Sequence, residues 1–167
     1  MQTEQFTLDL SFLAADFQQE WRRCSLAANY IAAYAAYQFE RRERMENLIS
    51  TIANEMLETA VRLAPPRSDL QMRCVQLEDG LRLDSSHHIR GEAARPYLTL
   101  LEQLQNGRQD ELYLELLTSE QDPADYFNQL GLTMIAHDFG ARLTARLKER
   151  TNRIYTEVFI PIEELSA

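Results

Sequence analysis

The sequence predicts an α+β protein, a two-layer sandwich in which helices cover one face of a mixed sheet. Two observations point to this class. Segments with alternating apolar and polar residues, typical of half-buried strands, occur near both ends of the chain, and longer segments with helical apolar spacing lie between them. Strands adjacent in sequence are joined by turns rather than by helices. Because the chain has 167 residues and no internal repeat, we expect one domain over residues 1–167.

The N-terminal part, about residues 1–45, is predicted to extend this domain by a strand and a helix. FTLDLSF, residues 6–12, alternates apolar and polar side chains, as a strand does. From about Ala14 the spacing becomes helical, and alanines recur between positions 27 and 36, where they would let another element approach closely. We interpret this segment as a core helix whose larger apolar residues are Phe17, Trp21, Leu26, Tyr30, Ile31 and Tyr34.

A charged break, ERRERMEN, precedes a second predicted helix that runs to about Leu63. Pro65 and Pro66 end this helix, because a proline disfavours helical geometry in the residue before it. Its apolar stripe consists of Leu48, Ile52, Met56 or Ala53, Leu57 and Ala60. Two strands follow in DLQMRCVQLEDGLRLD, and Asp79-Gly80 is a hairpin signal between them.

The C-terminal half carries three further helical patterns and two strands. Helices are expected over residues 95–104 and 110–118, with Asn106-Gly107 as the turn between them. A third helix is expected over residues 125–139, ending at Gly140 as its C-cap. Two final strands are predicted in ARLTARLKE and RIYTEVFIPI.

Charge and hydropathy limit the classes of partner. The formal net charge of −9 opposes binding to nucleic acid or to an anionic membrane surface, and the basic run Arg41, Arg42, Arg44 is interrupted by glutamates. The sequence has no apolar run long enough to span a bilayer, and MQTEQFTLDL lacks the features of a signal peptide. We therefore expect a soluble, cytoplasmic protein that binds neither nucleic acid nor membrane.

One polar cluster lies on the second predicted helix. Glu55 stands three residues before Glu58 and four before Thr59, so these side chains and Asn54 share one side of the helix. A carboxylate and a hydroxyl one turn apart are able to hold a hydrated Mg²⁺ or to orient a water molecule. The alternative is a solvated helix face, which the spacing alone favours.

Other candidate motifs are weaker. Adjacent histidines, His87 and His88, could bind one metal ion only if they lie in a loop, because neighbouring residues of a strand point to opposite faces. Cys24 and Cys74 are far apart and form no metal-binding pair. The sequence contains no phosphate loop, dinucleotide fingerprint or nucleophile elbow. The residues alone thus predict a soluble α+β domain and no particular reaction.

Two longer segments resemble a known family. ISTIANEMLETAVRLAP resembles the N-box helix of the GHKL (Bergerat-fold) ATPases, which include histidine-kinase ATP-binding domains and anti-sigma-factor serine kinases. LGLTMIAHDFGARLTARLKERTNRIYTEVFIPI resembles the closing segment of that family, with its G2 box. WRRCSLAANYIAAY, the Asp79-Gly80 hairpin and LGLTMIAHDFGA are similar to SiaB-like bacterial partner-switching regulators. The resemblance extends from about Trp21 to Ile162.

The resemblance implies a nucleotide site for ATP or ADP with Mg²⁺. Glu55 falls at the N-box acid, which orients the attacking group in kinases of this fold, and Thr59 falls at the Mg²⁺-coordinating asparagine. Asp84 matches the aspartate that binds the adenine amino group. Gly131 and Leu132 match what remains of the G2 box.

Several of these positions depart from the family pattern. Threonine is shorter than asparagine and lacks its amide, so Thr59 weakens the case for a bound metal ion. Ser85, Ser86, His87 and His88 stand where glycines are expected after the adenine-binding aspartate, and glycine permits a close backbone approach that they do not. We infer that the fold is kept and that the nucleotide site is eroded.

The leading functional hypothesis is a bacterial signalling regulator with a degenerate GHKL fold, which binds a STAS-like or similar protein in a partner-switching pathway. The second is an active serine/threonine protein kinase that phosphorylates this partner. A third is a small-ligand or metal sensor that uses His87 and His88. The alanine-rich stretch 27–36 and the strand at residues 6–12 are also candidates for a homodimer surface.

Overall fold

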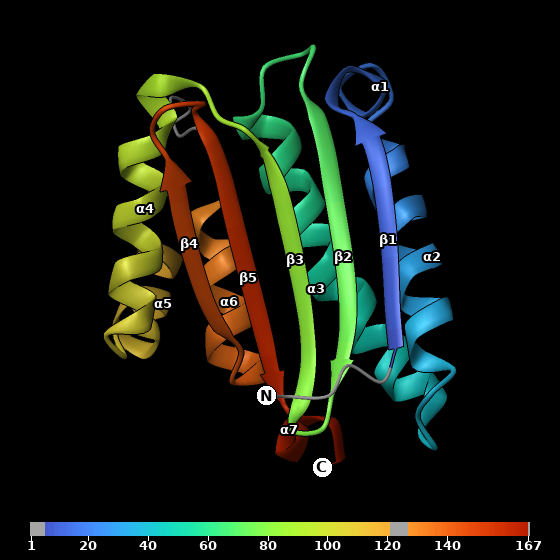
Figure 1. Ribbon diagram of the computed structural model, residues 1–167. Coiled ribbons are helices and arrows are strands. Elements are labelled where there is room, and N and C mark those ends of the chain that lie inside the picture. Colours follow the sequence, from blue (N-terminus) through green and yellow to red (C-terminus); the bar gives the residue numbers. More distant parts are fainter. Residues whose placement is uncertain (1–5, 121–126, 167) are drawn as a thin grey trace.

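The computed structural model describes residues 6–120 and 127–166, which form an antiparallel sheet with helices on one face (Figure 1). The other face of the sheet is not covered by any helix of the described residues. The strands are β1 (Phe6–Leu13), β2 (Asp69–Leu77), β3 (Gly80–His88), β4 (Arg142–Lys148) and β5 (Arg153–Pro161). The helices are α1 (Ala14–Gln19), α2 (Arg22–Ala36), α3 (Arg42–Leu63), α4 (Gly91–Gln105), α5 (Gln109–Thr118), α6 (Gln129–Phe139) and α7 (Ile162–Ser166).

The five strands have the order β1-β2-β3-β5-β4, and each neighbouring pair is antiparallel. The predicted mixed sheet is therefore wrong, although the α+β class and the helical layer on one face are confirmed. The reason lies in the helical hairpin of α2 and α3, which returns the chain to the end of the sheet where β1 finished (Figure 1). There the amide of Ala14 donates to the carbonyl of Ser68, so β2 starts beside the end of β1 and runs back along it.

The predicted first helix is two helices, and its buried face differs from the one expected. α1 ends at Gln19 and α2 begins at Arg22. Of the larger apolar residues only Phe17 and Ile31 are buried, whereas Trp21, Leu26, Tyr30 and Tyr34 are exposed. The buried positions of α2 are mostly alanines: Ala28, Ala32, Ala35 and Ala36, beside Cys24. Small side chains let α2 and α3 approach closely, so the large ones are left on the outer face.

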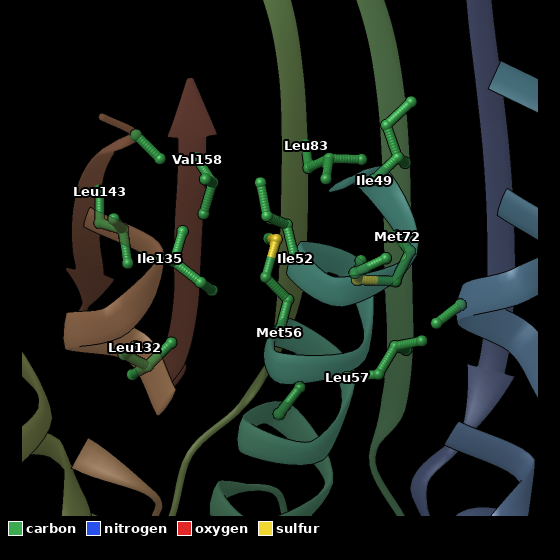
Figure 2. Close-up of a cluster of buried hydrophobic side chains, with 14 of the residues drawn as sticks. Ile49, Ile52, Met56, Leu57, Met72, Leu83, Leu132, Ile135, Leu143 and Val158 are labelled. Atoms are coloured by element: carbon green, nitrogen blue, oxygen red, sulfur yellow. The ribbon is translucent and has the colours of Figure 1, made fainter. Parts of the chain in front are cut away.

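The core lies between the helical layer and the sheet (Figure 2). The predicted apolar stripe of α3 is confirmed, because Leu48, Ile52, Met56, Leu57 and Ala60 are all buried. Other large side chains in this cluster come from α3, the sheet and α6, namely Ile49, Met72, Leu83, Leu132, Ile135, Leu143 and Val158. α3 therefore packs against both the sheet and α6.

Turn and cap residues occupy the predicted places. Gly80 begins β3 directly after the predicted hairpin turn, and a Cβ atom at this position would collide with the carbonyl oxygen of Ile160 on β5. Gly140 caps α6 with a left-handed φ of 60°. The predicted helix at residues 125–139 is observed from Gln129 onward, and residues 125 and 126 lie outside the described residues. Within the described ranges, no helix is both long and apolar enough to cross a lipid bilayer.

Candidate functional site

Three of the predicted site residues lie together where α3 passes the beginning of α6. Glu55 projects from the middle of α3, and its carboxylate lies directly against the Cα of Gly131 in the first turn of α6. A Cβ atom at position 131 would overlap Oε2 of Glu55 and would come within 2.9 Å of Nδ2 of Asn128. Glycine is therefore the residue that this contact between the two helices requires. Thr59 follows Glu55 by one turn on α3 and is 4% exposed.

Polar atoms of this cluster are buried without hydrogen-bond partners. Oδ1 of Asn54, Oε2 of Glu55 and Oγ1 of Thr59 are all inaccessible to solvent and unpaired among the described residues. Elsewhere in the protein a buried hydroxyl is paired, since Oγ1 of Thr156 lies 2.6 Å from the hydroxyl of Tyr97. Native proteins leave few buried polar atoms unpaired, so three on one face of one helix mark a candidate binding site.

Burial also changes the electrostatics of Glu55. Loss of solvent raises the pKa of its carboxyl group, and the nearby Glu58 carboxylate raises it further, while Arg62 acts in the opposite direction. The Arg62 guanidinium lies over the ring of Trp21, 5.2 Å from the ring centroid. Burial likewise raises the pKa of the neighbouring Cys24 thiol to about 11, so this thiol is protonated at neutral pH. The cluster therefore resists gaining further negative charge.

The N-terminus of α6 is already capped by the protein. The backbone amide of Gly131 donates to Oδ1 of Asn128 at 3.1 Å, which uses one of the amides that a phosphate could have contacted. The carboxylate of Glu55 occupies the space beside the same glycine. In the described part of the chain, no group of three or more His, Cys, Asp or Glu side chains is placed to bind a metal ion. At the start of α6, the protein's own Asn128 and Glu55 side chains therefore occupy the surroundings of the Gly131 amide.

The remaining predicted site residues lie elsewhere. Leu132 is 1% exposed and points into the core beside Ile135, so only its backbone is near the cluster (Figure 2). Asp84 lies on β3 and belongs to the uncovered face of the sheet, where Nε of Arg82 lies 3.1 Å from each of its carboxylate oxygens. Asp84 and Glu55 are therefore on opposite sides of the sheet. The structure does not bring the predicted adenine-binding aspartate together with the N-box acid.

The two histidines do not form a shared metal site. β3 extends through His88, so His87 and His88 are consecutive strand residues and point to opposite faces. His87 is 1% exposed, and burial lowers the pKa of its imidazole to about 4, so the ring is neutral at physiological pH. Nδ1 of His88 lies 3.0 Å from the carbonyl oxygen of Thr151 on the other side of the sheet. The two imidazole rings therefore lie on opposite faces of the sheet and do not face a common metal ion.

The uncovered face of the sheet contains a hollow of about 810 Å³ that the sequence motifs did not reveal. The strand register places one row of charged side chains directly across it, from Asp9 through Arg73 and Asp84 to Glu157. Arg146, Tyr155 and Ser86 also line the hollow. The signal in the sequence is the period-2 alternation of polar residues on all of these strands, which becomes a surface only when the strand order is known.

No protein-family model matches the sequence, and no curated protein matches it either.

Proposed function

We propose that this protein is a bacterial signalling regulator that acts by binding another protein and that carries an eroded GHKL-type nucleotide site. One observation carries the proposal: at the start of α6 the amide of Gly131 is satisfied by Asn128, and the Glu55 carboxylate lies against the same residue. Both groups occupy the position from which a helix N-terminus would bind phosphate. The binding partner we propose is a STAS-like protein of a partner-switching pathway in the cytoplasm.

The position of Asp84 supports the same proposal. In the resemblance this residue reads adenine, yet here its side chain pairs with Arg82 on the face of the sheet that the helices do not cover. A nucleotide held near Glu55 would therefore lack the contact that selects adenine. This arrangement favours a regulator over an ATP-dependent enzyme.

An active serine/threonine protein kinase is the second candidate, and one observation favours it. The buried acceptors of Asn54, Glu55 and Thr59 have no partners, and a bound ligand with hydrogen-bond donors would satisfy them. In that case Glu55 would orient the attacking hydroxyl of the partner. The two candidates differ in whether ATP binds at all.

Calorimetric titration of ATP and ADP, with and without Mg²⁺, distinguishes them. We expect no binding by the wild-type protein and none by Glu55→Ala. The matched control is Glu157→Ala, which removes a carboxylate from the opposite face of the sheet at a position with no predicted role in nucleotide binding. Mg²⁺-dependent ATP binding that is lost in Glu55→Ala but kept in Glu157→Ala would contradict the regulator and support the kinase.

A second experiment tests the protein partner and the proposed loss of metal binding. A purified STAS-domain protein is mixed with the wild-type chain, and complex formation is followed by size-exclusion chromatography in the absence of nucleotide. We expect a complex to form without ATP, and transfer of phosphate to the STAS protein in the presence of ATP would contradict the proposal.

Thr59→Asn restores the amide of the family pattern, and a gain of Mg²⁺-ATP binding in this variant would support erosion at this position.

A further inference from the structure

A stripe of large apolar side chains runs along the outer face of α2. Leu26, Tyr30 and Tyr34 of α2 and Tyr37 at its C-cap are 54%, 56%, 49% and 70% exposed, and they follow one another at intervals of four, four and three residues. This spacing places all four on one side of the helix. The guanidinium of Arg42 lies over one face of the Tyr37 ring, 4.6 Å from the ring centroid. An exposed apolar patch of a few hundred Å² is often a site of interaction with another protein.

The side of α2 opposite the stripe packs against α3 inside the protein. Ala28, Ala32 and Ala35 are at most 1% exposed and pack α2 closely against α3. The alanine-rich stretch that was a candidate dimer surface is thus used inside the protein. α2 is the outermost helix beyond the β1 edge of the sheet, and no other described element lies outside it (Figure 1).

We propose that the stripe, defined as Leu26, Tyr30, Tyr34 and Tyr37, pairs with the same stripe of a second copy in an antiparallel helix-to-helix dimer. The shape of α2 suits self-pairing, because the half-buried Ala27 and Ala33 flank the large side chains and leave room for those of a copy. An isologous contact centred near Tyr30 and Ala33 would place Leu26 of one copy beside Tyr37 of the other.

The area of the stripe sets the expected strength. A buried aromatic side chain covers about 150–250 Å², and these four side chains are roughly half exposed. They therefore offer about 400 Å² per copy, or about 800 Å² for the pair, which is below the about 1,200 Å² that a stable interface buries. The dimer is consequently weak and reversible. Because each copy carries a net charge of −9, salt should strengthen it by screening the repulsion.

Sedimentation equilibrium across the micromolar range tests the association. The weight-average mass should rise from 19.4 kDa toward twice this value, and it should rise at a lower protein concentration in high salt. Tyr30→Glu, in the middle of the stripe, should raise the dissociation constant at least about tenfold. The control is Leu114→Glu on α5, which removes another large apolar side chain that is 64% exposed and should leave dimerisation unchanged.

Cross-linking tests the antiparallel orientation. Arg22→Cys and Gln38→Cys place single exposed thiols near the two ends of α2, and the native Cys24 and Cys74 are buried. In a mixture of the two variants, a short bismaleimide should couple position 22 of one copy to position 38 of the other more than it couples identical positions. A monomer at all concentrations, larger open assemblies, equal loss of association in Leu114→Glu, or coupling between identical positions would each overturn the proposal.

Discussion

At the scale of single residues, the polar side chains at Glu55 are more buried than their spacing along the helix suggests. By spacing alone, Glu55 and Thr59 were more consistent with a solvated face of a helix. The structure places the carboxylate of Glu55 against Gly131 of α6, buries Thr59 one turn further along α3, and leaves an oxygen of each unpaired among the described residues. The sequence could place them on one side of α3, but it could not show that α6 covers that side, because this depends on how distant elements pack.

The hydroxyl of Thr59 gives the first prediction. Thr59→Val keeps the shape of the side chain and removes an unpaired buried oxygen, so we expect the free energy of unfolding to rise by up to about 1 kcal/mol. Thr156→Val is the matched control, because it removes a hydroxyl that is bonded to Tyr97 and should lower stability by about 1–2 kcal/mol. Urea denaturation of the two variants measures both changes. A loss of stability in Thr59→Val would show that the hydroxyl has a partner.

The carboxyl group of Glu55 gives a prediction about pH. Its pKa is raised by folding, so the unfolded chain releases this proton at a lower pH than the folded one. The group therefore lowers stability as the pH rises from about 4, the unfolded value, through the folded value. Glu55→Gln removes this penalty, and we expect it to be more stable than the wild type at pH 7 by about 1 kcal/mol, with a smaller difference near pH 4.

Denaturation at a series of pH values measures this difference. Glu111→Gln is the control, because Glu111 is an exposed residue whose pKa is lowered by its hydrogen bond with Arg108. Removing a surface pair of this kind should change stability little at any pH. If Glu55→Gln were as stable as the wild type at pH 7, the buried carboxylate would not carry the cost that we assign to it.

At the scale of elements, α2 is the helix that the sequence described least well. Helical spacing of Trp21, Leu26, Tyr30 and Tyr34 suggested a core face, because large apolar residues are usually buried. The protein instead buries the alanines on the opposite side against α3. Both faces of this helix are apolar, so periodicity alone could not decide between them, and the close packing of α2 and α3 did.

A substitution within this packing tests the interpretation. Ala32 lies on the buried side of α2 and is not exposed to solvent. Ala32→Leu adds three carbon atoms there, and we expect it to destabilise the protein by about 1–3 kcal/mol. Ala33→Leu, on the adjacent half-buried position, is the matched control and should change stability by less than about 0.5 kcal/mol. Thermal unfolding followed by circular dichroism compares them. Equal effects would mean that α2 is not packed closely through its alanines.

At the scale of the whole molecule, the strands and turns were predictable and the topology only partly so. Asp79-Gly80 and Gly140 mark local turns and caps, and each is found where local chemistry places it. The antiparallel arrangement of β1 and β2 depends on how the two helices between them fold back on each other, which the sequence pattern alone does not show. The placement of Asp84 on the face away from Glu55 follows from the register of β3, which the sequence did not determine.

The same helical hairpin has a consequence for the order in which the protein assembles. β2 and β3 meet through a tight turn, where Leu77 pairs with Gly80, whereas β1 finds β2 only after the whole of α2 and α3 has been made, as the pairing of Phe6 with Gln76 shows. Closing a long loop costs more chain entropy than closing a short one, so the β2–β3 hairpin should form early, and β1 and β5, which pair with it across intervening helices, should join it later. During synthesis β1 therefore stays unpaired until α2 and α3 have folded. Until then, β2 is an edge strand of the sheet.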